Sequence, residues 1–112
     1  MERTYIRDLK TKIGRQVTLK GWLQTLRDQK SMQFLIMRDA TGLVQVAHWK
    51  KGNPELAETI TKLGTESALT ITGTVVENAV VKLGGIEIQL ESLVVENNAE
   101  LPLPFEPFAD TL

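Results

Sequence analysis

Apolar and polar residues alternate through residues 33–46, QFLIMRDATGLVQV, and this period of two predicts a β-hairpin. The side chains expected to face the core are Leu35, Met37, Val44 and Val46. Between the two strands, residues 39–42 have turn chemistry, and Gly42 is free to adopt a positive φ. One face of the hairpin is therefore an ordinary hydrophobic row.

The opposite face of the hairpin carries less usual side chains. Phe34 and Gln45 both point outward, where water does not favour a phenyl ring. An aromatic ring stacks on a flat ligand, and an amide that both donates and accepts hydrogen bonds reads the edge of a base. These two residues therefore indicate a nucleobase-binding surface. The structural alternatives are edge packing of Phe34 under the loop of residues 27–32 and a solvated strand position for Gln45.

Three further stretches have the alternation that predicts strands. They are residues 16–26, residues 67–77 and residues 86–90, the last continuing toward residue 95. Gly21 interrupts the first of these strands and marks a bulge or a sharp bend in it. Gly84 and Gly85 provide the turn before the last strand. With hairpin strands at residues 33–38 and 43–49, the chain supplies five strands in all.

One helix is expected between the third and fourth strands. Asn53 is an N-cap, Pro54 occupies the first helical position, and Gly64 closes the helix. The apolar residues at helical spacing are Leu56, Ile60 and Leu63. Three strands, one helix and two strands predict an all-β, five-stranded Greek-key barrel of the OB-fold type, which binds oligonucleotides on strands two and three. An SH3-like barrel does not place a helix at this point.

The C-terminal residues differ in composition from the rest of the chain. Residues 101–107 read LPLPFEP, and their three prolines predict an extended, stiff segment instead of further globular fold. We therefore expect one OB-fold domain over residues 1–100, followed by a Pro-rich hinge over residues 101–112.

Bulk composition narrows the class of protein. With 112 residues the chain is long enough for one domain with a real core, and the absence of cysteine excludes disulfides, thiolate metal sites and cysteine nucleophiles. The longest apolar runs are far shorter than a membrane span, and the N-terminus has no signal-peptide pattern. We expect a cytoplasmic protein with no membrane partner.

Charge is distributed unevenly although the net charge is near zero. Of the 13 Lys and Arg residues, 11 lie at or before Lys51, where only 4 of the 14 acidic residues are found. A basic half suits a polyanionic partner, because phosphate contacts supply most of the sequence-independent affinity for nucleic acids. Lys30, Lys50 and Lys51 are the expected tethers for an RNA backbone. The alternative is that both halves simply have solvated faces.

The sequence contains no credible active site. It has no nucleophile with a partner base, no phosphate-cradling glycine loop and no set of metal ligands. Several conspicuous residues have structural interpretations instead. Arg38 and Asp39 form a structural pair at the hairpin end, Trp22 packs, and Trp49 covers the barrel end beside the helix. His48 is expected at the surface.

Four segments together resemble a known family. They are GWLQTLRD at residues 21–28, the hairpin QFLIMRDATGLVQV, TGTV at residues 72–75 and the terminal ELPLPFEP. The chain resembles the N-terminal anticodon-binding domain of aspartyl- and asparaginyl-tRNA synthetases over almost its whole length. The stretch KLGGIEIQLESLVVEN is similar to the archaeal-type or asparaginyl branch.

The resemblance implies roles for individual residues. Phe34 corresponds to the phenylalanine that stacks on the central anticodon uridine, and Gln45 to the glutamine that hydrogen-bonds this base. Arg27 corresponds to a basic residue that contacts the loop, and Glu87 to an acid near the anticodon. The implied partner is the anticodon loop of aspartate or asparagine tRNA, and the seven expected nucleic-acid-binding residues are Arg27, Lys30, Phe34, Gln45, Lys50, Lys51 and Glu87.

The resemblance also implies what this chain does not do alone. Aminoacylation with ATP and Mg belongs to a class II catalytic domain beyond residue 112, in an enzyme that is a homodimer, so this chain needs no cofactor and the isolated domain is expected to be a monomer. The alternatives are a general single-strand binder, a free-standing synthetase paralogue, and an oligomerisation or scaffold module. The cognate amino acid stays open, because Gln24 and the pair Ala79 and Val80 fit neither a strict nor a relaxed pattern.

Overall fold

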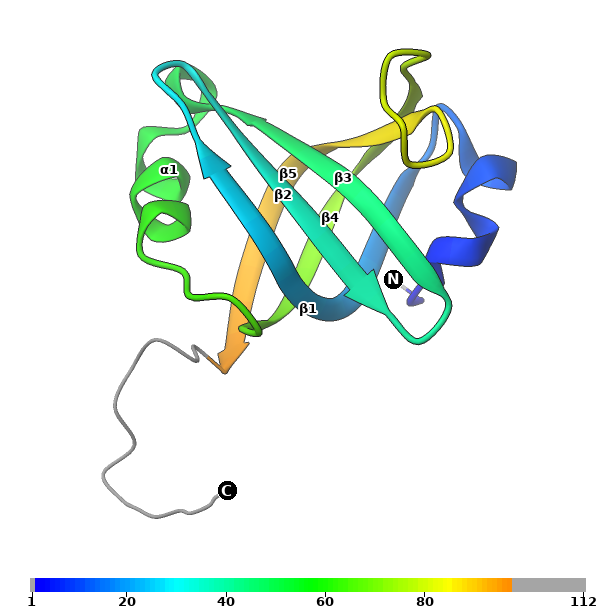
Figure 1. The fold of residues 1–112 in the computed structure, drawn as a ribbon, viewed down its shortest axis with the longest axis horizontal. Helices are drawn as coiled ribbons and strands as arrows, with labels where there is room; N and C mark the ends of the chain where they lie inside the picture. The colour runs from blue at the N-terminus through cyan, green and yellow to red at the C-terminus, as the bar shows by residue number, and fades with distance from the viewer. Residues whose placement is uncertain (1, 98–112) are drawn as a thin grey trace.

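Five strands form a closed barrel in the computed structural model, which describes residues 2–97 (Figure 1). The strands are β1 (Gln16–Asp28), β2 (Met32–Asp39), β3 (Gly42–Trp49), β4 (Ala68–Glu77) and β5 (Ile86–Asn97). Their order around the barrel is β1-β2-β3-β5-β4, and β4 pairs with β1 to close it. The predicted five-stranded OB-fold barrel is therefore confirmed.

The β2–β3 hairpin has the register that the alternation predicted. Leu35 pairs with Val46 and Met37 with Val44, and all four side chains are at most 1% exposed. The neighbours of this hairpin differ in direction, since β1 pairs with β2 antiparallel whereas β3 pairs with β5 in parallel. The inward row belongs to the single hydrophobic core of the barrel.

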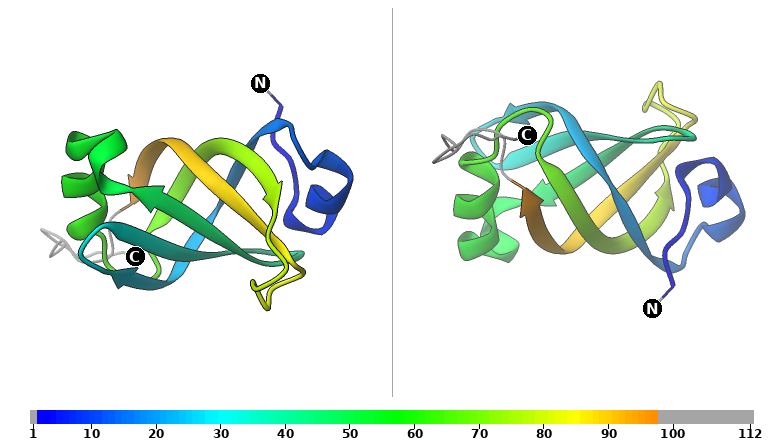
Figure 2. Two further views of the ribbon diagram at one scale, coloured as in Figure 1. Left: turned by 90° about the horizontal axis from the view of Figure 1, so that it is seen from above. Right: turned by 90° about the horizontal axis from the view of Figure 1, so that it is seen from below.

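Short helical elements cover the two opposite ends of the barrel (Figure 2). The 3-10 helix η1 (Ile6–Lys12) lies at one end, and η2 (Lys50–Gly52) with α1 (Pro54–Thr61) lies at the other. The predicted N-cap is confirmed, because Asn53 Oδ1 accepts a hydrogen bond of 3.1 Å from the Leu56 N–H. The helix ends at Thr61, before the predicted end at Gly64. The Gly64 carbonyl instead accepts hydrogen bonds from Ser67, within the turn that leads into β4.

The glycines at three predicted positions act differently. The register irregularity in β1 lies between Leu23 and Thr25, not at Gly21, where a Cβ would collide with the Arg38 carbonyl oxygen of β2. The expectation of a positive φ at Gly42 is wrong; Gly42 instead leaves room for the Ile6 side chain. The turn before β5 is confirmed, since Gly84 and Gly85 have φ of 77° and 69°.

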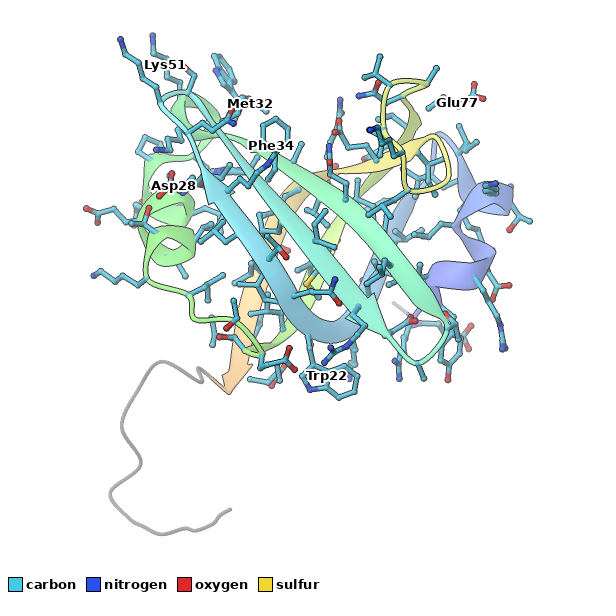
Figure 3. All side chains as sticks on the ribbon, viewed as in Figure 1. Trp22, Asp28, Met32, Phe34, Lys51 and Glu77 are labelled. Carbon is cyan, nitrogen blue, oxygen red and sulfur yellow. The ribbon has the colours of Figure 1, made fainter. Side chains whose placement is uncertain are left out.

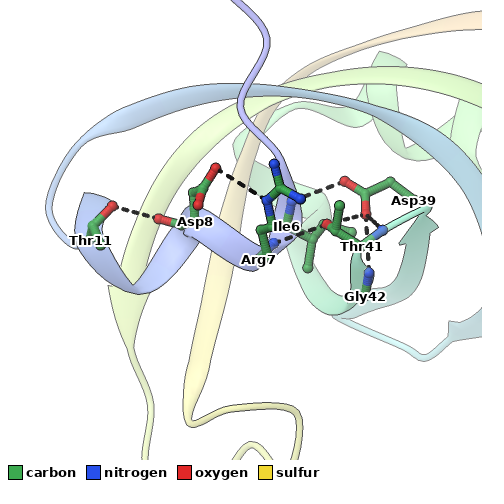
Figure 4. Close-up of polar contacts among 7 residues, drawn as sticks. All are labelled: Ile6, Arg7, Asp8, Thr11, Asp39, Thr41 and Gly42. Atoms are coloured by element: carbon green, nitrogen blue, oxygen red, sulfur yellow. Dashed lines mark hydrogen bonds and ion pairs between the residues drawn. The ribbon is translucent and has the colours of Figure 1, made fainter.

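Asp39 ties η1 to the β2–β3 turn (Figure 4). One carboxylate oxygen accepts the Ile6 N–H at 2.9 Å, and the other accepts Thr41 N–H, Thr41 O–H and Gly42 N–H at 2.6–3.1 Å. Burial opposes ionisation of this carboxyl, but these hydrogen bonds outweigh it and lower the pKa of Asp39 below its ordinary value. Asp39 is thus structural, as predicted, although Arg38 pairs with Glu66 at 2.6 Å and not with Asp39.

The proposed hinge, residues 101–112, lies outside the described residues, as does the end of the predicted domain at residues 98–100. Over residues 2–97, none of the helices is long and apolar enough to cross a membrane.

Candidate nucleic-acid interface

The outward side chains of β2 and β3 form rows across the hairpin, and three of these rows lie beyond the pair Arg38 and Leu43 near the turn. Ile36 faces Gln45, Phe34 faces Ala47, and Met32 faces Trp49. The alternation that buries Leu35 and Val46 places these residues on the outside, because successive side chains of a strand point to opposite faces. This outer face is the surface on which an OB-fold binds oligonucleotides.

A cavity of about 480 Å³ opens on this face. Its lining brings together Arg27 of β1, Phe34 of β2, Gln45 of β3 and Glu87 of β5. Phe34 is half-buried and lies on the outside of the barrel, as Figure 3 shows. Its ring is therefore neither sunk in the core nor turned away from Gln45, and four of the seven predicted site residues meet in one place.

Gln45 and Glu87 are joined directly. The two residues face each other in the parallel β3–β5 pairing, and Gln45 Nε2 donates a hydrogen bond of 2.7 Å to Glu87 Oε2. This contact fixes which end of the amide is which, because a carboxylate only accepts. The carbonyl oxygen of Gln45 and its second N–H remain to meet a ligand. Glu87 itself is only 9% exposed.

Arg27 lies over the Phe34 ring. Its guanidinium carbon is 5.4 Å from the ring centroid, the geometry of a cation–π contact, and the two residues face each other across β1 and β2. Arg27 does not form an ion pair with the neighbouring Asp28, which is instead ion-paired with Lys50 at 2.7 Å. A flat ligand that enters the cavity therefore meets an aromatic ring and a guanidinium together.

The three predicted lysines lie outside the cavity, at the tip formed by the β1–β2 loop and η2. The Lys50 N–H donates to the Ser31 carbonyl at 3.0 Å, which joins the two segments. The hydrogen bond from the Lys50 side chain lowers the pKa of Asp28. Lys30 and Lys51 are exposed and form no ion pair within residues 2–97. Figure 3 shows Lys51 at this tip, beyond Met32 and Phe34.

The β4–β5 loop completes the cavity. Of this loop, the family resemblance singled out only Ala79 and Val80, as positions tied to the choice of tRNA, and its other residues were not predicted to bind. Its lining residues are Asn78, Val80, Val81, Lys82 and Leu83. Two signals were present in the sequence. Val80 is an apolar side chain in a turn and is 83% exposed, and Lys82 is one of only two basic residues after Lys51.

His48 is buried, so its predicted surface position is wrong. It points inward at the α1 end of the barrel and is 4% exposed, and its Nδ1 lies 3.0 Å from Gln33 Oε1. Gln33 is itself 0% exposed and donates through Nε2 to the Ala57 carbonyl of α1 at 3.0 Å. The two residues pair across β2 and β3. The alternation of side chains along β2 and β3 is consistent with Gln33 and His48 on the inner face, but polar residues were not expected there.

The two tryptophans are both exposed. Trp22 is 43% exposed and lies under Arg38, whose guanidinium carbon is 5.6 Å from its ring centroid, so the packing role expected for Trp22 is not observed. Trp49 is 57% exposed and lies beside η2, near Gly52. Within residues 2–97, no group of three or more His, Asp or Glu side chains is placed to hold a metal ion.

Three comparisons with known proteins agree with this architecture. A family model described as "OB-fold nucleic acid binding domain" matches residues 17–96. Similar curated proteins include the aspartate–tRNA(Asp) ligase of Thermoplasma volcanium, 41% identical over 105 residues, which cover 93% of this chain and 24% of that protein. The asparagine–tRNA ligase of Desulforamulus reducens is 39% identical over 100 residues, covering 89% of this chain and 23% of that protein.

A solved structure shows the same fold at comparable coverage. The asparaginyl-tRNA synthetase of Pyrococcus horikoshii, complexed with asparaginyl-adenylate, superposes with a TM-score of 0.82 and 33% identity over 93% of this chain and 24% of that chain. The chain thus spans about a quarter of the length of the proteins it matches, and those proteins carry both aspartate and asparagine names.

Proposed function

This chain belongs to the family of OB-fold nucleic acid binding domains, as an anticodon-binding domain of the aspartyl- and asparaginyl-tRNA synthetase type, and from that premise we propose that it reads the central uridine of a tRNA anticodon. The observation that carries the proposal is the meeting of Phe34, Gln45, Arg27 and Glu87 in one cavity on the outer face of the barrel. A base leaving the anticodon stack fits such a cavity, since it exposes both a flat face and a polar edge.

Stacking supplies affinity in this proposal. Phe34 offers the ring face, and Arg27, now over that ring at 5.4 Å, turns its guanidinium to the base or to its phosphate. Stacking of one base on an aromatic side chain contributes about 1–3 kcal/mol, so it accounts for a large part of the affinity of a short loop.

Gln45 supplies the identity of the base. Uridine presents an N3–H donor between two carbonyl acceptors, and Gln45 matches this edge with its carbonyl oxygen and its remaining N–H. Cytidine presents an unprotonated N3 that would face the Gln45 oxygen, and two acceptors repel each other. Glu87 strengthens the selection of uridine over cytidine, because its hydrogen bond of 2.7 Å with Gln45 Nε2 prevents the Gln45 amide from rotating by half a turn to match cytidine.

The lysines at the tip hold the backbone of the loop. Lys30 and Lys51 are exposed there without ion pairs among the described residues, and Lys82 stands on the opposite rim of the cavity. Such contacts are independent of sequence and weaken as salt is added. The affinity for the loop should therefore fall linearly on a plot of log affinity against log salt, with similar slopes for uridine and cytidine loops.

The function of the full-length protein follows the same proposal. A protein that joins this domain to a class II catalytic domain would ligate aspartate or asparagine to the bound tRNA, with ATP and Mg acting in that second domain. The homodimer expected for such a protein would leave this domain's cavity for the anticodon.

The test is a titration of the chain with an anticodon stem-loop whose central base is uridine or cytidine. We expect the cytidine loop to bind more weakly, and we expect Phe34→Ala to weaken binding of the uridine loop by about 5- to 150-fold, the equivalent of 1–3 kcal/mol. Leu43→Ala is a matched control, because Leu43 is an outward, exposed side chain of the same hairpin that does not line the cavity.

Two of the alternatives predict different results in the same titration. A general single-strand binder would bind both loops equally, and an oligomerisation or scaffold module would bind neither. Equal affinity for uridine and cytidine, or no effect of Phe34→Ala, would contradict the proposal.

A further inference from the structure

An exposed apolar surface lies on the outer side of β1, β4 and β5, and the function proposed above does not use it. Its large apolar side chains are Trp22 of β1, 43% exposed, and Val94 of β5, 56% exposed. They lie in adjacent rows, because Trp22 pairs with Ala68 of β4 and Val94 pairs with Thr70 of the same strand. Figure 3 shows Trp22 well apart from Phe34, near the other end of β2. The surface at Trp22 and Val94 is therefore separate from the cavity at Phe34.

A polar cluster at the start of β4 holds the Trp22 ring in place. The guanidinium carbon of Arg38 lies 5.6 Å from the centroid of this ring, and the same guanidinium is ion-paired with Glu66 at 2.6 Å. Glu66 has a φ of 68°, the one positive φ outside glycine among the described residues. A residue with a side chain adopts this conformation only where its surroundings impose it. The cluster therefore holds an exposed indole in a fixed position, ready to receive a ligand.

The charges beside this surface do not favour RNA. Glu66 and Glu96 are both exposed, and Glu96 accepts a hydrogen bond of 2.8 Å from Thr70. On the basic side, Lys20 is exposed, but the charge of Arg38 is already paired with Glu66. A polyanionic strand gains little at such a surface, because its affinity comes mostly from an excess of positive charge. An apolar occupant with little charge fits better.

The chain leaves the barrel next to Trp22. Asn97 is the last residue of β5 and pairs with Ala68, and Ala68 pairs with Trp22 on its other side. Neighbouring strands lie about 4.8 Å apart, so the backbones of Asn97 and Trp22 are separated by about 10 Å. A chain extends by at most about 3.3–3.6 Å per residue, so the four residues that follow Asn97 can span about 13 Å. Leu101 is therefore within reach of the indole.

Residues 101–107, LPLPFEP, have the chemistry of such an occupant. They are apolar except for Glu106, and their three prolines favour a polyproline II backbone. Segments of this kind dock on exposed aromatic rings, and their preset backbone reduces the entropy lost on docking. At about 3.1 Å per residue the segment spans about 19–22 Å. This length is enough to cover both Trp22 and Val94.

From these observations we propose that the surface at Trp22 and Val94 is the docking site for the chain's own residues 101–107, whose proline rings stack on the indole. A second copy of the chain is a poorer occupant, because Trp22 and Val94 cover far less than the roughly 1,000 Å² that a stable interface buries. A segment of the same chain needs less area, since its effective concentration at the surface is high. Docking fixes the direction in which the chain leaves the barrel, and it gives Trp22 the packing role that the sequence predicted.

Nuclear magnetic resonance of the 112-residue chain tests the contact directly. We expect nuclear Overhauser effects between the indole protons of Trp22 and the ring protons of Pro102 or Pro104, together with upfield shifts of those proline signals. Trp22→Ala should abolish the upfield shifts. Trp49→Ala is the matched control and should preserve them, because Trp49 is also an exposed tryptophan but lies beside η2.

Tryptophan fluorescence is the second measurement. The sequence has two tryptophans, so Trp49→Phe leaves Trp22 as the sole one. In this background, the pair of substitutions Pro102→Ser and Pro104→Ser should shift the Trp22 emission to the red and increase its quenching by acrylamide, since the ring loses its cover. Phe108→Ser lies just outside the segment and should change neither. Thermal unfolding verifies that each variant is folded.

Three results would overturn the proposal. The first is the absence of Overhauser effects between Trp22 and residues 101–107, and the second is Trp22 emission that is unchanged by the proline substitutions. The third is a signal that disappears on dilution, which would identify a second copy as the occupant. The uridine loop provides an independent comparison. If Trp22→Ala weakens its binding as much as Phe34→Ala does, the surface contacts RNA instead of the chain's own segment, whereas unchanged binding supports the proposal.

Discussion

The two faces of the β2–β3 hairpin carry polar and aromatic groups for different purposes. On the inner face, Gln33, Asp39 and His48 are at most 5% exposed, and their hydrogen bonds attach α1 and η1 to the barrel. On the outer face, Phe34 and Gln45 are partly exposed. Under the proposed function, alternate residues of the same two strands therefore divide stability from binding. Substitutions should affect one property and spare the other.

Among the polar residues of the inner face, Asp39→Ala should cause the largest loss of stability, with little loss of RNA binding. The substitution leaves the N–H groups of Ile6, Thr41 and Gly42 without their acceptor at the end of the barrel. Loss of a charged hydrogen-bond acceptor that serves one buried and two part-buried N–H groups should lower the free energy of unfolding by about 2–4 kcal/mol. Urea denaturation measures this free energy.

The control for this substitution is Asp8→Ala. Asp8 belongs to the same element η1 but is exposed, and its only ion pair in the described part of the chain is a long one, 3.9 Å to Arg7. Its removal should change stability by less than about 0.5 kcal/mol. A large loss of affinity for the uridine loop in Asp39→Ala, measured where the variant is fully folded, would break the division between the two faces.

Gln33→Ala should cause the next largest loss of stability. The amide of Gln33 joins His48 of β3 to the Ala57 carbonyl of α1 at distances of 3.0 Å each. Its removal leaves the buried His48 Nδ1 without this partner and takes one of the hydrogen bonds from the Ala57 carbonyl, which keeps the bond from Thr61 Oγ1, so we expect the free energy of unfolding to fall by about 1–3 kcal/mol. Calorimetric or urea unfolding measures it. An unchanged stability would mean that water replaces the amide and that α1 does not depend on this contact.

His48 should make stability depend on pH in a narrow window. Burial lowers the pKa of His48 below its ordinary value of 6.5, so the unfolded chain takes up a proton at a higher pH than the folded chain does. The contribution is therefore fully present above pH 6.5 and is lost as the pH falls through the lower folded pKa. The lowered carboxyl pKa values, those of Asp28, Asp39 and Glu91, act only below their ordinary 3.8–4.5.

His48→Gln is the matched variant for this measurement. A glutamine still has a donor for Gln33 but does not titrate. As the pH falls below 6.5, the midpoint of urea unfolding should drop for the original chain and stay level for the variant. Parallel curves for the two proteins would show that His48 is protonated equally easily in both states.

Sequence alternation was enough for the outer face and for the hydrophobic part of the inner face. Phe34 and Gln45 were placed correctly because strand period fixes sides, and the inward row of Leu35 and Met37 followed from the same rule. Contacts between strands that are far apart in the sequence could not be predicted from this alternation. Glu87 meets Gln45 through the parallel β3–β5 pairing of two segments 42 residues apart, which no local pattern encodes. The family resemblance indicated only that Glu87 lies near the anticodon.

The inner polar residues were missed for a related reason. Gln33 and His48 are polar residues at inward positions, and each is acceptable in the core only because the other lies opposite and because α1 brings the Ala57 carbonyl to them. A buried histidine is therefore a product of tertiary pairing. The same holds for the β4–β5 loop, whose place beside Phe34 depends on barrel closure.

Phe34→Ala should change stability far less than the substitutions on the inner face, and it sharpens the comparison most. The ring is only partly buried and contacts Arg27 at the surface, so its removal forms no closed cavity in the core. We expect the free energy of unfolding to change by less than about 1 kcal/mol, far below the 3–5 kcal/mol typical of a core Phe→Ala substitution. The same variant should lose about 5- to 150-fold in affinity for the uridine loop.

Leu35→Ala, one residue along and facing inward at 0% exposure, is the reciprocal variant: it should lower stability by about 2–5 kcal/mol and leave the affinity of the folded protein nearly unchanged. If both variants lose stability equally, Phe34 is a packing residue, and its outward position is not an adaptation to a base.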